Sequence, residues 1–211
     1  LKNLEKLTIK SPEDIIILEN LATVLHKLDE YALAIKVSLK LLEIEPLNAT
    51  RYFNLGTLLK NQGRYKEAKE YVISAIRLDP KVASYWLLLG LAESNFGRIY
   101  HAIEVWKKVI NLDKYDLRAW AYNNIANAYI KTGETDLAYE FYNKALNSNE
   151  VLNYKSQEKI QNNYLCNLGY LSSDIEQIYK SHREFRKIYD DKFQYTFQNK
   201  QKYKTNNKIR I

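Results

Sequence analysis

The chain has 211 residues, of which 46% are hydrophobic and 27% are charged, and these proportions are ordinary for a soluble globular protein. No apolar run approaches the roughly 20 residues that span a bilayer, and no signal-peptide pattern opens the chain, so we expect a cytoplasmic protein with no membrane partner. The single cysteine, Cys166, excludes an internal disulfide, and no cluster of Cys and His has the spacing of metal ligands.

The net charge of +7 is concentrated at one end of the chain. Residues 192–211 contain six cations and no acid, which leaves 26 cations and 25 acids in residues 1–191. A solvated basic linker is the favoured interpretation of this segment, ahead of an arm that binds phosphate. Nucleic acid is therefore a disfavoured partner. The chain contains no methionine, even at position 1, which indicates a fragment or a processed protein.

A repeat with a period near 34 residues organises the chain. The three prolines stand at positions 12, 46 and 80, and glycine recurs at Gly56 and Gly90 and at Gly63 and Gly97. A fixed period of this length indicates a solenoid of short helical units. A partial repeat would cover residues 1–14, and four full units would cover residues 15–48, 49–82, 83–116 and 119–152.

Each unit is expected to fold as two antiparallel helices that cross at small side chains. The small residues stand at the eighth and twentieth positions of the units, and they are Ala22, Gly56, Gly90, Ala126, Ala34, Ala68, Ala102 and Ala138. Bulky residues at the fourth and twenty-fourth positions, such as Trp86 and Trp106, are expected to fill the core rather than to bind a ligand. Glycine should end the first helix of a unit, as at Gly63 and Gly97, and proline should close the unit.

This pattern resembles the tetratricopeptide repeat over residues 11–152. The residues that carry the resemblance are Pro80, Trp86, Leu89, Gly90, Ala102 and Val109. The resemblance implies an all-α fold, a right-handed superhelix of antiparallel helix pairs. Its concave groove would be lined by the first helix of every unit and would bind extended peptides or proteins. The sequence leaves homo-oligomerisation open.

Asparagines recur at the sixth position of the units, where the first helix should face the groove. Asn20, Asn54 and Asn124 hold this position, Leu88 interrupts the series, and Asn127 lies three residues beyond the last. A carboxamide has both a donor and an acceptor, so a ladder of them can pair with the backbone of an extended peptide. The alternative is that asparagine is simply abundant, at 20 of 211 residues, and the sequence favours neither interpretation.

Two other kinds of site are disfavoured. Chaperone-binding members of the repeat family hold a terminal carboxylate with a clamp of lysines, arginine and asparagines, and four of the five corresponding positions differ here. These positions are Glu19, Thr23, Asn54, Ser84 and Leu88. His26, His101 and His182 lie in separate units, none beside a nucleophile. No catalytic residue, cofactor site or metal site is assigned, so the chain alone is expected to be catalytically inert.

After Leu152 the register breaks, and residues 153–190 are expected to form a divergent terminal helix pair. One helix should cover residues 154–170, and a second should begin at Ser173, which has a glutamate three positions on as in a capping box. The segment 162–189 resembles the linker that precedes the catalytic region of O-linked N-acetylglucosamine transferases and their SPINDLY-like relatives. Its matching features are Asn163, Leu168, Tyr170, Ser173, His182, Arg183 and Phe185, whereas an aliphatic residue is usual at Tyr164.

The second resemblance implies a narrower function. The chain would be the non-catalytic part of a protein glycosyltransferase that presents acceptor polypeptides, with Asn163 extending the ladder. Residues 191–211 would be a basic linker and the start of a truncated, nucleotide-sugar-dependent domain, because Lys208 to Ile211 alternate like half a strand. The alternatives are a degenerate helix pair that only caps the solenoid, and a stand-alone scaffold or adaptor that mediates protein–protein interactions.

Overall fold

The computed structural model describes residues 12–113, 116–148 and 154–171, together with residues 174, 176, 178 and 180–183. The helices named below are α1 (Pro12–Lys27), α2 (Tyr31–Ile44), α3 (Ala49–Asn61), α4 (Tyr65–Leu78), α5 (Ala83–Asn95), α6 (Ile99–Leu112), α7 (Asp116–Thr132), α8 (Thr135–Asn147) and α9 (Tyr154–Leu171). The expectations for residues 1–11 and 184–211, which include most of the partial repeat, the basic linker and the half-strand, lie outside the described residues.

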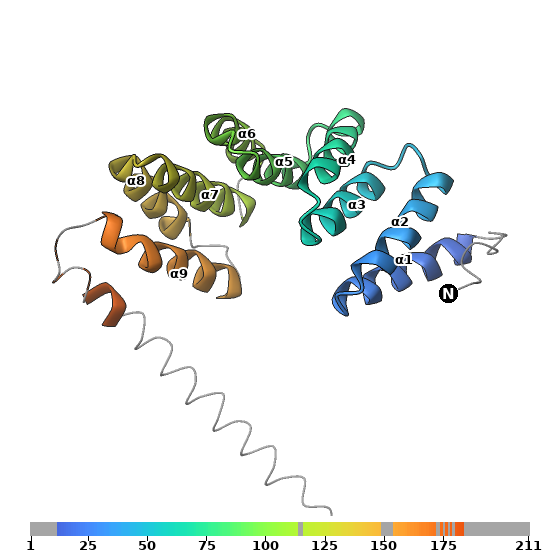
Figure 1. The fold of residues 1–211 in the computed structure, drawn as a ribbon, viewed down its shortest axis with the longest axis horizontal. Coiled ribbons are helices and arrows are strands. Elements are labelled where there is room, and N and C mark those ends of the chain that lie inside the picture. Colours follow the sequence, from blue (N-terminus) through green and yellow to red (C-terminus); the bar gives the residue numbers. More distant parts are fainter. Residues whose placement is uncertain are drawn as a thin grey trace, which may run out of the picture.

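The helices form a curved row of consecutive pairs (Figure 1). Each helix packs against the next one along the chain, and α5 also contacts α7, as α7 contacts α9. Every unit therefore buries its apolar surface against its immediate neighbours, which is the arrangement of a solenoid. The prediction of an all-α solenoid of antiparallel helix pairs is confirmed.

A left-handed residue follows the first helix of each unit. Gly63, Gly97 and Gly133 have φ values of 76°, 73° and 80°, a backbone conformation in which a side chain is strained. In the first unit the corresponding residue is Asp29, with φ of 58°. Aspartate tolerates this conformation better than most residues, and the Tyr31 hydroxyl donates a hydrogen bond to its carboxylate. The first unit thus forms the same turn with aspartate in place of glycine.

Small residues in the first helix of a unit pack against bulky side chains of the second helix, as predicted. A Cβ placed on Gly90 would lie 2.2 Å from Trp106 Nε1, so only glycine fits against the indole. Trp106 is buried, and its indole N–H donates to the Leu87 carbonyl over 3.2 Å. Tyr142 is also fully buried. The prediction that the bulky stripe is core is confirmed at these two positions, while Trp86 is only half-buried.

A buried carboxylate ties three helices together. Glu93, on α5, is 1% exposed, and its oxygens lie 2.6 Å from Lys69 Nζ on α4, 3.4 Å from Arg98 and 3.5 Å from His101 Nδ1 on α6. Burial acts to raise the pKa of this carboxyl group, but the hydrogen bond from Lys69 and the nearby positive charges outweigh it and lower the pKa. Glu93 is therefore ionised at neutral pH.

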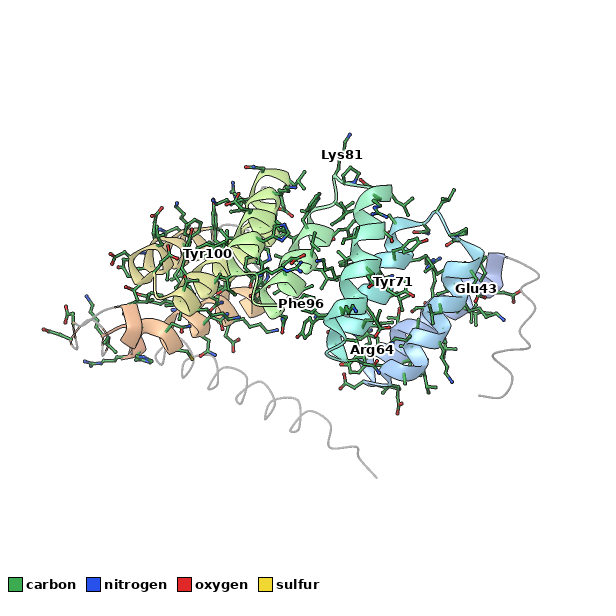
Figure 2. The ribbon with its side chains drawn as sticks, turned by 45° about the horizontal axis from the view of Figure 1, so that its top comes forward. Glu43, Arg64, Tyr71, Lys81, Phe96 and Tyr100 are labelled. Carbon is green, nitrogen blue, oxygen red and sulfur yellow. The ribbon has the colours of Figure 1, made fainter. Side chains whose placement is uncertain are left out.

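Several large apolar side chains are exposed on the surface of the described part. Phe96 and Tyr100 are exposed around the turn between α5 and α6 (Figure 2). The Tyr100 hydroxyl donates to Glu134 Oε1 over 2.9 Å and so links the corresponding turns of two successive units.

Among the helices described, none combines the length and apolar character needed to cross a membrane.

Candidate peptide-binding pocket

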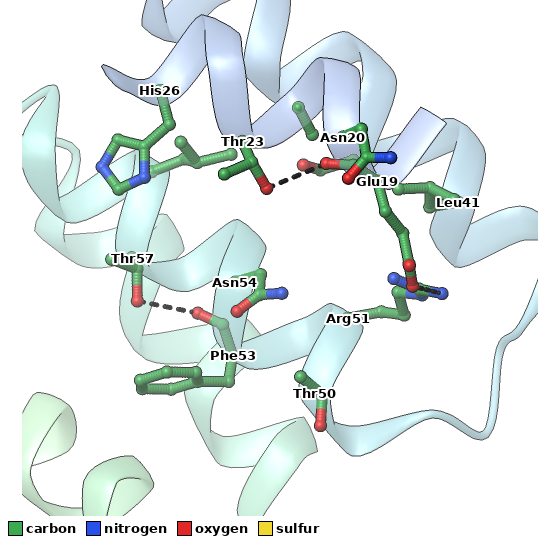
Figure 3. Close-up of a pocket in the computed structure, with 13 residues that line it drawn as sticks. Glu19, Asn20, Thr23, His26, Leu41, Thr50, Arg51, Phe53, Asn54 and Thr57 are labelled. Carbon is green, nitrogen blue, oxygen red and sulfur yellow. Dashed lines mark hydrogen bonds and ion pairs between the residues drawn. The ribbon is translucent and has the colours of Figure 1, made fainter. Parts of the chain in front are cut away.

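A pocket of about 420 Å³ opens between α1, α2 and α3. α1 and α3 are the first helices of neighbouring units, and they have at most marginal contact, whereas α5 and α7 touch directly. The gap between α1 and α3 is therefore not closed by side-chain packing. Figure 3 shows polar side chains from both helices around this space.

Two matching pairs of side chains form opposite walls of the pocket. Asn20 and Thr23 come from α1, and Asn54 and Thr57 come from α3, one period further along the chain (Figure 3). Residues three apart lie on the same face of a helix, so each pair presents a carboxamide and a hydroxyl together. Among the described residues, the carboxamides of Asn20 and Asn54 have no hydrogen-bond partner. Both remain available to a ligand.

The threonine hydroxyls of the pocket already donate hydrogen bonds within the protein. Thr23 donates to the Glu19 carbonyl over 2.9 Å, and Thr57 donates to the Phe53 carbonyl over 3.0 Å. A hydroxyl oxygen that has donated its proton can still accept. The two threonines thus offer acceptors to the pocket, while the two asparagines offer both donors and acceptors.

An ion cluster forms one end of the pocket. Arg51 is buried, and its guanidinium contacts Glu19 Oε1 at 2.5 Å and Glu45 Oε2 at 2.6 Å. Desolvation acts to lower the pKa of Arg51, but its bonds to the two carboxylates outweigh this and raise it. The hydrogen bond from Arg51 lowers the pKa of Glu45. One guanidinium thus faces two carboxylates, so the cluster keeps one net negative charge.

A histidine lies at the rim of the pocket. The carboxamide nitrogen of Asn61, on α3, lies 2.8 Å from Nε2 of His26, on α1. This contact joins the two helices beside the pocket, and His26 contributes to the pocket wall.

The remaining predicted site residues lie elsewhere, on α7 and α9. Asn127 donates to the Asn123 carbonyl over 3.0 Å and accepts from the Tyr142 hydroxyl over 2.6 Å. Asn163 donates to Asn123 Oδ1 over 3.1 Å. The half-buried Asn124 takes part in none of these bonds. The structure thus brings Asn20 and Asn54 together in the pocket, but it engages Asn127 and Asn163 in bonds within the protein.

An apolar stretch separates these two polar regions. Leu88 and Leu91, on α5, hold the positions that Asn54 and Thr57 hold on α3, and Leu88 is buried. The predicted ladder is therefore not continuous. Its asparagines face a pocket in the first two units, leucine replaces asparagine in the third unit, and the asparagines beyond it include residues that bond within the protein. Among the residues described, no group of His, Cys, Asp and Glu could hold a metal ion.

Comparisons with known proteins agree with the fold. Two segments, residues 49–82 and 121–151, match the family model described as tetratricopeptide repeat, and both fall within predicted units. The fold is a tetratricopeptide-repeat solenoid. The crystal structure of the MamA protein superimposes with a TM-score of 0.60 at 20% identity, and the alignment covers 95% of this chain and 99% of MamA.

Two further solved structures share the tetratricopeptide-repeat solenoid. A MamA from Desulfovibrio magneticus RS-1 has a TM-score of 0.63 at 13% identity, covering 84% of this chain and 96% of that one. The Sgt2 TPR domain from Aspergillus fumigatus has a TM-score of 0.53 at 24% identity, covering 59% and 82%. At these identities the likeness shows the fold alone. A search of curated proteins finds no match.

Sequence reasoning missed several residues of the pocket in this tetratricopeptide-repeat solenoid. Thr23 is expected only as a departure from the carboxylate clamp, and Thr57, Arg51 and Glu45 are not among the predicted site residues. The repeated spacing Asn-x-x-Thr at residues 20–23 and 54–57 is a signal that could have identified both threonines. The ion cluster has no such signal, because Glu19, Glu45 and Arg51 meet only through tertiary packing.

Proposed function

We propose that this chain is a binding module that holds an extended polypeptide against its first helices, with the pocket between α1 and α3 as the anchor. The observation that carries the proposal is the pair of carboxamides, Asn20 and Asn54, that face one pocket without partners among the described residues. A peptide unit has one donor and one acceptor, and a carboxamide can satisfy both. Such contacts read the backbone rather than the side chains, so many sequences would bind.

The pocket suits a peptide better than it suits catalysis. Its volume is about 420 Å³, which is the range for small ligands or a few side chains. Its polar groups are carboxamides, hydroxyls and an ion cluster, and none forms a nucleophile–base pair. Binding and orientation are the chemistry that this arrangement can provide. A cytoplasmic location belongs to the same proposal.

The test measures binding of an N-acetylated, C-amidated and fluorescently labelled peptide of nine residues, built from Ala and Ser with one central lysine. Asn54→Ala removes up to two hydrogen bonds, so the Kd should rise about tenfold by fluorescence polarisation. Methylation of the peptide's central backbone amide should cause a similar loss in the unaltered protein, because it blocks the same pairing.

The matched control is Asn147→Ala, because Asn147 is exposed on α8, far along the chain from the pocket. Its affinity for the peptide should not change. If Asn54→Ala also leaves the Kd unchanged, the pocket does not pair with peptide backbones and the proposal is wrong.

A narrower context is that the chain presents acceptor polypeptides to a nucleotide-sugar-dependent glycosyltransferase domain. What supports it is the resemblance of residues 162–189 to the linker of that enzyme class, much of which lies outside the described residues. Solved structures that share the fold include a MamA protein and an Sgt2 TPR domain, and these fit the alternative, a stand-alone adaptor. The coding sequence after Ile211 separates the two. A long α/β region that begins Gly-Tyr supports the transferase, and a stop codon within a few residues excludes it.

A further inference from the structure

We propose that the pocket between α1 and α3 accepts a positively charged group of the bound peptide, the side chain of a lysine or arginine. This inference rests on the proposed function and adds a chemical class to it. Three features of the pocket carry it: the acceptors on its walls, the net charge of the ion cluster, and the apolar surface beside that cluster.

Several side chains around the pocket offer acceptors without a free proton of their own. The hydroxyl oxygens of Thr23 and Thr57 can only accept, because their protons are bonded to backbone carbonyls. Glu19 contacts Arg51 through Oε1, and 43% of its side chain is exposed. This partly exposed carboxylate can therefore still accept from a ligand. An ammonium or guanidinium group has donors only, so it complements this set of acceptors.

Charge favours the same class of group. Arg51 neutralises only one of the two carboxylates that it contacts. Residues 12–61, which contain all of α1 to α3, hold seven acids and five cations, although the whole chain has a net charge of +7. The pocket thus lies in the acidic part of a basic protein. Such a local field raises the association rate of a cationic partner and disfavours an anionic one.

The apolar residues of the pocket fit the stem of the same side chains. Phe53 and Leu58, on α3, line the pocket together with Glu19. A lysine or arginine buries its methylene stem on such surfaces while its charged head stays at the polar end, and a cation near the Phe53 ring gains a cation–π contact. Stem and head would therefore be recognised by neighbouring residues.

The experiment compares peptides that differ only at the central residue of the acetylated and amidated nine-residue probe. Lysine should bind about fivefold more tightly than norleucine, which keeps the stem and lacks the charge, and glutamate should bind more weakly than both. The preference should fall when NaCl is raised from about 50 to 300 mM. A norleucine peptide with a free N-terminal amine tests the other source of an ammonium group.

Substitutions of the protein assign the preference to Glu19. Glu19→Gln should reduce the ratio between lysine and norleucine affinities to about one. Glu43→Gln is the matched control, because Glu43 is exposed on α2 and does not line the pocket (Figure 2). Circular dichroism checks that each variant is folded.

The outcomes separate the inference from the proposed function. If all three peptides bind equally well and Asn54→Ala still weakens them, the charge preference is wrong and backbone pairing stands. The charge preference is also wrong if Glu43→Gln changes the ratio as much as Glu19→Gln does. If the free N-terminal amine restores the affinity of the norleucine peptide, the group recognised is the peptide terminus. If no peptide binds, the proposed function is wrong.

Discussion

The fit of Gly90 against Trp106 makes a sharp prediction at the scale of a single residue. A methyl group at Gly90 would overlap the indole ring, with its carbon 2.2 Å from Nε1. Trp106 cannot move away, because it is buried and bonded to Leu87. Gly90→Ala should therefore lower the free energy of unfolding by about 1–3 kcal/mol, measured by urea denaturation.

Gly169 provides the opposite case in the same protein. It lies in α9, and a Cβ added to it would meet nothing within 4 Å. Gly169→Ala should stabilise the chain by about 0.5–1 kcal/mol, because alanine loses less backbone entropy in a helix. If both substitutions change stability in the same direction, the contact with Trp106 is not what requires glycine at position 90.

At the scale of helices, the buried Glu93 predicts how stability depends on pH. Its pKa is lowered from the ordinary value of 4.5 in the folded state. As pH falls, the unfolded chain takes up this proton first, so the contribution of Glu93 is complete above about pH 4.5 and is lost below it. Glu93→Gln should cost about 1–3 kcal/mol at pH 7, and the difference from the unaltered protein should shrink towards pH 3.

Glu104→Gln is the matched control for this prediction. Glu104 pairs with Lys107 on the surface of α6, with 65% of its side chain exposed, so its removal should change stability by less than about 0.5 kcal/mol at any pH. Urea titrations at several pH values measure both variants. A constant cost of Glu93→Gln from pH 7 to pH 3 would show that its loss disturbs packing and not an ion cluster.

The helix pairs could be predicted from the sequence because their causes recur every 34 residues. Three units repeat a small residue opposite a bulkier one, as in Gly90 and Trp106, and the same three units repeat a glycine in the turn. A local cause that recurs can be recognised without knowing the tertiary structure. Asp29 shows the limit of this reasoning, because it occupies the left-handed position without being glycine.

The candidate site was less predictable because its causes are not local. Asn20 and Asn163 have the same side chain, and the sequence places both in one ladder. In the structure Asn20 faces a pocket, whereas Asn163 bonds to Asn123, 40 residues earlier. The pocket itself depends on the distance between α1 and α3, which no repeated residue sets. Composition can suggest a polar groove, but only packing decides which amides are free.

At the scale of the whole molecule, the polar pocket lies at one end of a row of helices (Figure 1). The hydrogen bonds of Asn123, Asn127 and Asn163, here called the asparagine network, lie at the other end. Helices contact only near neighbours along this row, so the stability of one end should depend weakly on the other. The same geometry separates binding at the pocket from the packing of α7, α8 and α9. A single substitution in the network can test both statements.

Tyr142→Phe is that substitution, because the hydroxyl joins three helices. It donates to Asn127 on α7 and accepts from Asn167 on α9 over 2.9 Å. Loss of the hydroxyl leaves two carboxamides without this partner, so the opening free energy of α7 to α9 should fall by about 1–2 kcal/mol. Native-state hydrogen exchange measures it, and amides of α1 to α3 should keep their protection.

Peptide affinity at the pocket should also be unchanged by Tyr142→Phe. A continuous ladder from Asn20 to Asn163 makes a different prediction. Asn127 would lose its hydroxyl partner, so the Kd of Tyr142→Phe would rise as the Kd of Asn54→Ala does. Fluorescence polarisation with the lysine peptide therefore decides between a local anchor and a groove that acts along its whole length. Reduced protection throughout α1 to α9 would instead show that the solenoid opens as one cooperative unit, contrary to independent ends.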